Sequence, residues 1–178
     1  WGGAGASPDP DANPVDFAAA QAAAVAGTRL YRPADCASLL DRPGGSGPPP
    51  AVTVTPETTQ AAAQRLTAAD PAPVAVLNFA SARNPGGGFL NGAKAQEEDV
   101  CRCSGLFPCL LTQPDYYAVN RAQRSLIYTD HLIWSPPVPF FAVDRKATLP
   151  APFTASVITS PAPNGMHLQR HPDDREAS

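Results

Sequence analysis

The sequence predicts one α/β domain, in which a mixed sheet lies between helices. Three observations lead to this fold class. Short apolar runs alternate with helical patterns along most of the chain, which is typical of layered α/β proteins. The length of 178 residues is enough for one domain with a real core and too small for two large ones. The 22 prolines cluster between the patterned segments, so they mark connections.

The N-terminal part combines a loose segment with one helix. Residues 1–14 are rich in Gly, Pro and Asp, and we expect them to be flexible. Asp16 can cap a helix over Phe17–Ala26, which Gly27 would end. Residues 42–50 then form a loop rich in Pro and Gly.

The middle of the chain predicts two strands and a helix between them. Val52–Val54 has the composition of a short strand. Thr55 is a good N-cap with Pro56 at the first helical position, so the next helix should run to about Ala68. Val74–Phe79 is a compact apolar run between prolines, which predicts a buried strand.

The second half predicts further helices and then a group of strands. We expect a helix from about Ala95–Glu97 to Ser104, and shorter helices, broken by Pro108 and Pro114, to about Gln123. The expected strands are Ser125–Tyr128, Leu132–Trp134, Val138–Phe141 and Thr154–Thr159, with Pro136 and Pro137 interrupting the middle pair. The predicted domain therefore covers residues 15–165, and 166–178 form a polar tail.

Composition narrows the class of partner and the compartment. A net charge of −3 argues against a basic surface that grips nucleic acid, although backbone N–H groups could still hold a polyanion. No apolar run approaches the roughly 20 residues that span a membrane. Because the chain starts at Trp1, we interpret it as processed, trimmed or partial. Cys101 and Cys103 are too close for an ordinary disulfide framework, which favours a reduced, intracellular setting, cytoplasmic or nuclear.

The most informative motif is a glycine loop followed by adjacent carboxylates. Gly86, Gly87 and Gly88 are separated by seven residues from Gln96-Glu97-Glu98. Consecutive glycines let a backbone approach a ligand closely, but the spacing fits neither a P-loop nor a dinucleotide fingerprint. Neighbouring glutamates on a helix point about 100° apart, so they cannot flank one bond as in an ordinary glycosidase. One would act alone as acid and then base, and the other could orient a sugar hydroxyl. The alternative is that both only complement the helix dipole.

The stretch from Asn78 to Glu98 resembles the signature of microbial-type poly(ADP-ribose) glycohydrolases, in which three glycines precede Gln-Glu-Glu. The resemblance continues through Ser104–Pro108, Ile127–His131 and Ile158–Asn164, and covers roughly residues 50–165. It implies a macrodomain-like, three-layer fold with ADP-ribose in a cleft at the strand ends. It also implies hydrolysis of ribose–ribose O-glycosidic bonds in poly(ADP-ribose), with no metal or cofactor.

The resemblance also implies roles for particular residues. Glu98 would protonate the leaving ribose oxygen and then activate water, while Glu97 would bind ribose hydroxyls. The three glycines would follow the diphosphate and distal ribose. Gln96 would brace the loop. The other expected ligand-binding or site-shaping residues are Asn84, Phe89, Ser160 and Asn164. The implied partners are poly(ADP-ribose), ADP-ribose and ADP-ribosylated proteins, in ADP-ribosylation and the DNA damage response.

Other readings of the sequence stay open. Members of the family continue beyond the Ser-Pro-Ala-Pro-Asn segment with a second glycine-rich loop, which this sequence lacks, so the fold is expected to be incomplete at its C-terminus. The chain could therefore bind ADP-ribose without turnover, or be an inactive fragment. A zinc site built from Cys101, Cys103, Cys109 and His131 is a weaker alternative, because the spacing is unusual and buried thiols explain it as well.

Overall fold

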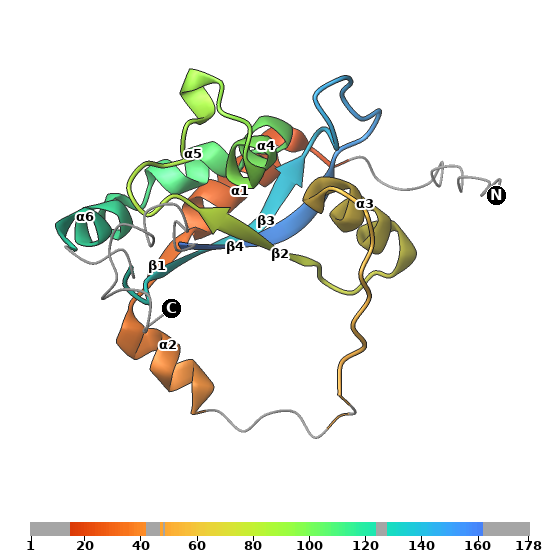
Figure 1. Cartoon of the computed structure of the whole chain (residues 1–178). Helices are drawn as coiled ribbons and strands as arrows, with labels where there is room; N and C mark the ends of the chain where they lie inside the picture. The colour runs from red at the N-terminus through yellow and green to blue at the C-terminus, as the bar shows by residue number, and fades with distance from the viewer. Residues whose placement is uncertain (1–14, 42–46, 48, 124–127, 162–178) are drawn as a thin grey trace.

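A four-stranded mixed sheet organises the protein (Figure 1). The structure is a computed structural model, and it describes residues 15–41, 47, 49–123 and 128–161. Among these residues, the strand order is β1-β3-β4-β2. The strands are β1 (Arg29–Tyr31), β2 (Ala75–Ala80), β3 (Leu132–Phe140) and β4 (Phe153–Pro161). β3 runs antiparallel to β1 and β4, whereas β2 runs parallel to β4.

Helices connect the strands and cover mainly one face of the sheet. They are α1 (Phe17–Gly27), α2 (Pro33–Leu40), α3 (Thr59–Ala69), α4 (Gln96–Cys103), α5 (Leu106–Leu111) and α6 (Pro114–Ala122), with a short 3₁₀ turn at Phe89–Asn91. In Figure 1, α1, α3, α4 and α5 lie above the sheet, and α2 lies below it at the end of β1. The predicted α/β class with a mixed sheet and flanking helices is confirmed.

The core lies between the sheet and the helices above it. β2 alternates, with Val76, Asn78 and Ala80 buried toward the helices. Leu77 and Phe79 point to the other face and are 46% and 57% exposed. The strand predicted at Val74–Phe79 is therefore confirmed as β2, but it is buried on one face alone, because helices of the described chain cover only that face. The largest buried apolar side chains belong to Tyr116, Tyr117, Phe140, Leu106, Leu110, Ile133, Val100, Val138 and Val157.

The start of α1 and the course of α4 match the sequence prediction closely. Asp16 caps α1 by accepting a hydrogen bond from the Ala19 N–H. The Gln21 side chain, on the inner side of α1, donates to the Gly105 carbonyl and ties this helix to the start of α5. α4 begins at Gln96 and ends at Cys103, one residue before the predicted end.

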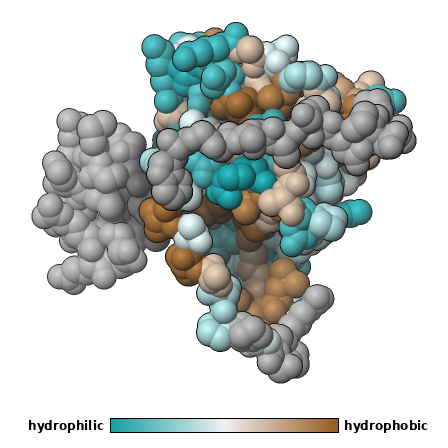
Figure 2. Space-filling view, turned by 90° about the vertical axis from the view of Figure 1, so that its right-hand side faces the viewer, coloured by the Kyte–Doolittle hydropathy of each residue, from teal (hydrophilic) through white to brown (hydrophobic). Residues whose placement is uncertain are grey.

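The segment before α3 differs from the prediction. Val52 and Val54 form no strand and are 88% and 92% exposed, because no neighbouring strand pairs with them. α3 begins at Thr59 rather than after Thr55, since the Thr58 hydroxyl caps it by accepting from the Ala61 N–H. In Figure 2, brown hydrophobic surface is visible below the centre of the molecule, on the side that carries α3 and this segment.

β3 is one strand where two were predicted. It runs through Pro136 and Pro137, and the register with β4 shifts between Ser135 and Val138. Proline is tolerated at such a bulge because the bulge removes the need for its missing N–H group. β1 and α2 were not predicted. Of the strand predicted at Ser125–Tyr128, residues 125–127 lie outside the described residues and Tyr128 is not in a strand.

The connection between β2 and α4 positions the functional residues. α4 starts beside the end of β2, and residues 81–95 connect the two as a loop that returns to the N-terminus of α4.

Within the residues that the structure describes, no helix is long and apolar enough to cross a membrane.

Candidate active site

The glycine loop adopts a backbone that requires glycine. Gly86 and Gly87 have φ values of 66° and 57°, in the left-handed region that side chains disfavour. The Gly87 N–H donates to the Asn84 carbonyl at 2.9 Å. A Cβ atom at Gly87 would collide with Oε1 of Glu98 and lie 3.0 Å from Oε2 of Glu97. Both carboxylates thus lie against the same glycine of the loop.

Glu98 joins the loop to the helix. Its Oε1 accepts a hydrogen bond from the Gly88 N–H at 2.7 Å, and its Oε2 accepts one from the Ala95 N–H at 2.9 Å. Glu98 is the third residue of α4, so it can reach back to the N-cap residue as in a capping box. The side chain is only 6% exposed and turns toward the loop rather than toward solvent. Each oxygen has a second acceptor position, which leaves both able to meet a ligand.

Glu97 lies deeper and contacts the end of β2. Its Oε2 accepts a hydrogen bond from the Ser81 N–H at 2.7 Å, and its Oε1 faces the Asn78 amide at 3.5 Å. Asn78 Nδ2 also donates to the Thr159 hydroxyl on β4, at 3.2 Å. Glu97 is 2% exposed. The end of β2 therefore holds Glu97, while the glycine loop and the start of α4 hold the neighbouring Glu98.

Burial raises the pKa of Glu97 to about 7, because removal from water disfavours the charged carboxylate. The Ser81 and Gly86 N–H groups and the Asn78 amide oppose this rise, since they favour the charged form, while the nearby Glu98 carboxylate adds to it. A carboxyl group with such a pKa carries a proton for part of the time at neutral pH. Glu97 can therefore act as either a donor or an acceptor toward a sugar hydroxyl.

Gln96 braces the edge of β2. Its Oε1 accepts from the Phe79 N–H at 3.0 Å, and its Nε2 donates to the Leu77 carbonyl at 2.9 Å. The amide side chain thus pairs with β2 as a neighbouring strand would. Nε2 also donates to the Thr59 hydroxyl at the start of α3, at 3.3 Å. This arrangement fixes the start of α4, and with it the two glutamates, relative to the sheet.

The remaining predicted site residues are only partly brought together. Asn84 is exposed, and its backbone N–H donates to the Ser81 hydroxyl. The Phe89 ring packs against Phe107, with ring centroids 5.0 Å apart. Ser160 is partly buried on β4, paired with Phe79 of β2. Asn164 lies outside the described residues.

Three residues that hold Glu97, directly or through Asn78, were not singled out from the sequence. They are Asn78, Ser81 and Thr159, and each lies at or near the carboxyl end of a parallel strand. One signal was present in the sequence, because Asn78 is a polar residue inside an apolar strand pattern, and such a residue needs a buried partner. The contribution of Ser81 comes from its backbone N–H, which no residue pattern reveals.

The residues considered for a zinc site have structural surroundings. Cys101, Cys103 and Cys109 are buried and free, and burial raises the pKa of each thiol. Nδ1 of His131 lies 2.9 Å from the Thr129 hydroxyl. Within the described parts of the chain, no group of three or more His, Cys, Asp or Glu side chains is placed to hold a metal ion.

Comparisons with known proteins show which family the chain resembles. The family described as "Microbial-type PARG, catalytic domain" matches residues 4–142, so the match begins well before residue 50 and ends before the Ile158–Asn164 motif. The poly(ADP-ribose) glycohydrolase of Thermomonospora curvata is 50% identical, with a TM-score of 0.80 over 85% of this chain. Another structure of the T. curvata enzyme, bound to the inhibitor ADP-HPD, is 50% identical over 85% of this chain, with a TM-score of 0.77. The Deinococcus radiodurans enzyme in complex with ADP-ribose is 45% identical, with a TM-score of 0.77 over 88% of this chain. No curated protein matches.

The matches leave part of each relative without a counterpart. The chain covers 56% and 54% of the two T. curvata structures and 63% of the D. radiodurans structure. The family match nevertheless extends over more than half of this chain and includes the glycine loop and both glutamates. The chain therefore belongs to the family of microbial-type poly(ADP-ribose) glycohydrolases.

Proposed function

We propose that this protein hydrolyses ribose–ribose O-glycosidic bonds in poly(ADP-ribose) and releases ADP-ribose. The observation that carries the proposal is the placement of two buried carboxylates against one loop glycine, Gly87. The relatives support the substrate, since one is solved with ADP-ribose and another with the inhibitor ADP-HPD. A macrodomain-like cleft at the carboxyl ends of β2 and β4 is the proposed place for the ligand.

Glu98 is the proposed general acid and base. It is the less buried of the two glutamates, and each of its oxygens keeps one acceptor position besides its backbone partner. The protonated carboxyl would give its proton to the leaving ribose oxygen as the glycosidic bond breaks. The resulting carboxylate is stabilised by the N–H groups of Gly88 and Ala95, and it would then take a proton from the attacking water.

Glu97 is the proposed substrate-positioning carboxyl. Its contacts with Asn78 and Ser81 fix its orientation, and its raised pKa suits hydrogen bonding to ribose hydroxyls. The glycine loop would meet the diphosphate through backbone contacts, because Gly86 and Gly87 carry no side chain to obstruct it. Asn84, Phe89, Ser160 and Asn164 are proposed to complete the ligand site.

Substitution of Glu98 tests this proposal directly. Glu98→Gln should lower kcat on poly(ADP-ribose) by about 10²–10⁴-fold, the usual contribution of a general acid–base group. Calorimetry should still detect ADP-ribose binding by the variant. Glu57→Gln is the matched control, because it makes the same change at a carboxylate that pairs with Arg65. Turnover by Glu98→Gln at the wild-type rate would contradict the assignment.

ADP-ribose binding without turnover is the second candidate function. It is motivated by the 56% coverage of the T. curvata enzyme, because the unmatched part could supply groups that hydrolysis needs. A chain-shortening assay on the polymer, run beside calorimetry with ADP-ribose, separates the two functions. Binding with no shortening would favour a binding module. The absence of both binding and shortening would favour an inactive fragment. In both functional cases the proposed partners are ADP-ribosylated proteins, in the response to DNA damage.

A further inference from the structure

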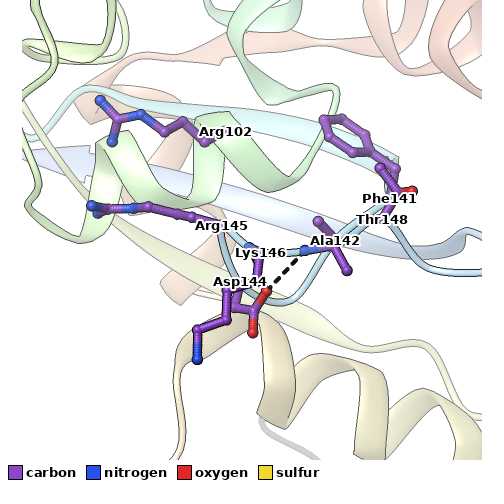
Figure 3. A pocket seen from close by; sticks show the side chains of 8 residues that line it. Arg102, Phe141, Ala142, Asp144, Arg145, Lys146 and Thr148 are labelled. Carbon is purple, nitrogen blue, oxygen red and sulfur yellow. Dashed lines mark hydrogen bonds between the residues drawn. The ribbon is translucent and has the colours of Figure 1, made fainter.

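An open cavity lies between the last turn of α4 and the loop that joins β3 to β4. Its volume is about 360 Å³, which falls in the range of roughly 300–1,000 Å³ for small-molecule sites. Arg102 contributes from α4, and Phe141, Asp144, Arg145 and Lys146 contribute from the other side. Figure 3 shows Arg102 and Arg145 extending in the same direction, with their guanidinium groups on one side of the cavity.

Cations dominate the lining of this cavity. Arg102, Arg145 and Lys146 are its basic residues, and Asp144 is the acidic residue among them. The Asp144 carboxylate is already engaged, because its Oδ1 accepts hydrogen bonds from the backbone N–H groups of Lys146 and Ala147. Arg145 pairs with the Asp99 carboxylate at 2.6 Å. Counting these two acids, three positive charges face two negative ones in a protein whose net charge is −3.

Arg102 has a donor without an acceptor. Its Nη2 donates to the Phe89 carbonyl at 3.3 Å, and its guanidinium carbon lies 5.7 Å from the centre of the Phe89 ring. Its Nη1 is buried and has no hydrogen-bond partner among the residues that the structure describes. A buried N–H group without a partner is costly, and an unmet donor in a native structure calls for a ligand, an ion or water.

We propose that this cavity binds a phosphate-bearing anion through Arg102, Arg145 and Lys146. Phosphate oxygens suit this donor set, because a guanidinium presents paired N–H groups and an ammonium adds a flexible point charge. The anion would meet the part of the Arg102 side chain that lines the cavity, beside Arg145 and Lys146. Since the same guanidinium holds the Phe89 carbonyl, just after the glycine loop, the bound anion also stabilises that end of the loop.

Two sources could supply the phosphate. The first is a neighbouring unit of poly(ADP-ribose), each unit of which carries a diphosphate, and this possibility rests on the proposed function. The second is a free phosphate compound that occupies the cavity independently of catalysis. Both share the chemistry of a diphosphate anion, so inorganic pyrophosphate is a suitable probe for either.

The test is isothermal titration of the wild-type protein and two charge-reversed variants with inorganic pyrophosphate. Lys146→Glu should weaken binding about tenfold or more, as expected when one charge-assisted contact becomes repulsive. Lys94→Glu is the matched control, because it makes the same change of charge at an exposed residue outside the cavity. It should leave the affinity within about twofold of wild type. Three outcomes overturn the proposal. Both substitutions could weaken pyrophosphate binding equally, Lys146→Glu could leave the affinity unchanged, or the wild-type protein could show no binding.

Chemical modification of the wild-type protein gives a second test that needs no variant. Pyrophosphate should slow the reaction of Arg145 with phenylglyoxal, followed by peptide mass spectrometry, and should leave the exposed Arg29 unprotected. Equal protection of both arginines, or protection of neither, counts against the site.

Kinetics on the polymer then separate the two sources. If a neighbouring polymer unit supplies the phosphate, Lys146→Glu raises KM for long poly(ADP-ribose) and leaves kcat unchanged. If KM is unchanged while pyrophosphate binding is lost, the site takes a free phosphate compound. The titration does not depend on turnover, so failure of the proposed hydrolase activity leaves its result interpretable.

Discussion

The Glu98 side chain accepts a hydrogen bond from the backbone N–H of Gly88 at 2.7 Å. This contact joins the two halves of the sequence motif, because Gly88 ends the glycine run and Glu98 ends the Gln-Glu-Glu run. The seven intervening residues form a loop that returns to the helix N-terminus, with a 3₁₀ turn at Phe89–Asn91. The spacing of the motif is therefore the length of chain needed to bring the acid back to the glycines.

The first prediction concerns Gly87, whose φ of 57° and closeness to both glutamates exclude a side chain. Gly87→Ala should lose both ADP-ribose binding and turnover, because the new methyl group displaces the Glu98 carboxylate. Gly92→Ala is the matched control, since Gly92 also has a left-handed φ, 79°, but has open space at the Cβ position. It should cost about 1–2 kcal/mol of stability from backbone strain and leave binding intact. Equal binding losses in the two variants would show that strain alone is responsible.

The second prediction concerns pH and the raised pKa of Glu97. Its pKa is about 7 in the folded protein against 4.5 in the unfolded chain, so the folded state holds the extra proton between these values. The contribution of this group to stability is fully present below about pH 4.5 and is lost as the pH rises through about 7. The loss is on the order of 3 kcal/mol at most, from 1.36 kcal/mol per pKa unit.

Urea unfolding at about pH 5 and about pH 8 measures this effect. Glu97→Gln should flatten the fall in stability between the two pH values, because glutamine does not titrate. Glu57→Gln should leave the fall in place, since Glu57 is an exposed carboxylate whose pKa is lowered by its hydrogen bond to Arg65. An unchanged pH dependence in Glu97→Gln would place the titrating group elsewhere.

The third prediction concerns Gln96 and the edge of β2. Gln96→Ala should lower the free energy of unfolding by about 1–3 kcal/mol, because the Phe79 N–H and the Leu77 carbonyl lose their partner. Gln96→Glu is the informative comparison. It keeps an acceptor for the Phe79 N–H but loses the donor to Leu77 and adds a charge beside Glu97, so it should not restore full stability. Full stability of both variants would mean that water replaces the side chain at this edge.

The fourth prediction concerns Asn78, which connects Glu97 to Thr159 on β4. Asn78→Leu removes the amide that favours the charged form of Glu97, so the pKa of Glu97 should rise further and the pH at which stability falls should move upward. Thr159→Val is the matched control, because it removes the partner of Asn78 without touching Glu97. A shift of equal size in Thr159→Val would show that burial alone, rather than the Asn78 amide, sets the effect.

Local patterns predicted much of the fold. Capping chemistry located the start of α1 at Asp16, and the acidic first turn located α4. These predictions succeeded because caps and first turns depend on neighbouring residues. The cap predicted at Thr55 was wrong, because Thr58 caps α3 instead. Two other predictions failed because they depended on distant partners. Val52–Val54 has the composition of a strand but lacks a neighbour to pair with, and Pro136-Pro137 continues β3 because β4 offers a bulged register.

For the site, the sequence by itself determined the residue types and their order, namely three glycines, a seven-residue spacer and a glutamine with two glutamates. These residues and their spacing were sufficient to indicate the family, because both can be read directly from the sequence. Only the tertiary structure decided that Gln96 pairs with the edge of β2, that Asn78 and Ser81 hold Glu97, and that Arg102 meets the cavity beside Phe89. Each of these depends on burial and on contacts across the fold, and burial is what raises the pKa of Glu97.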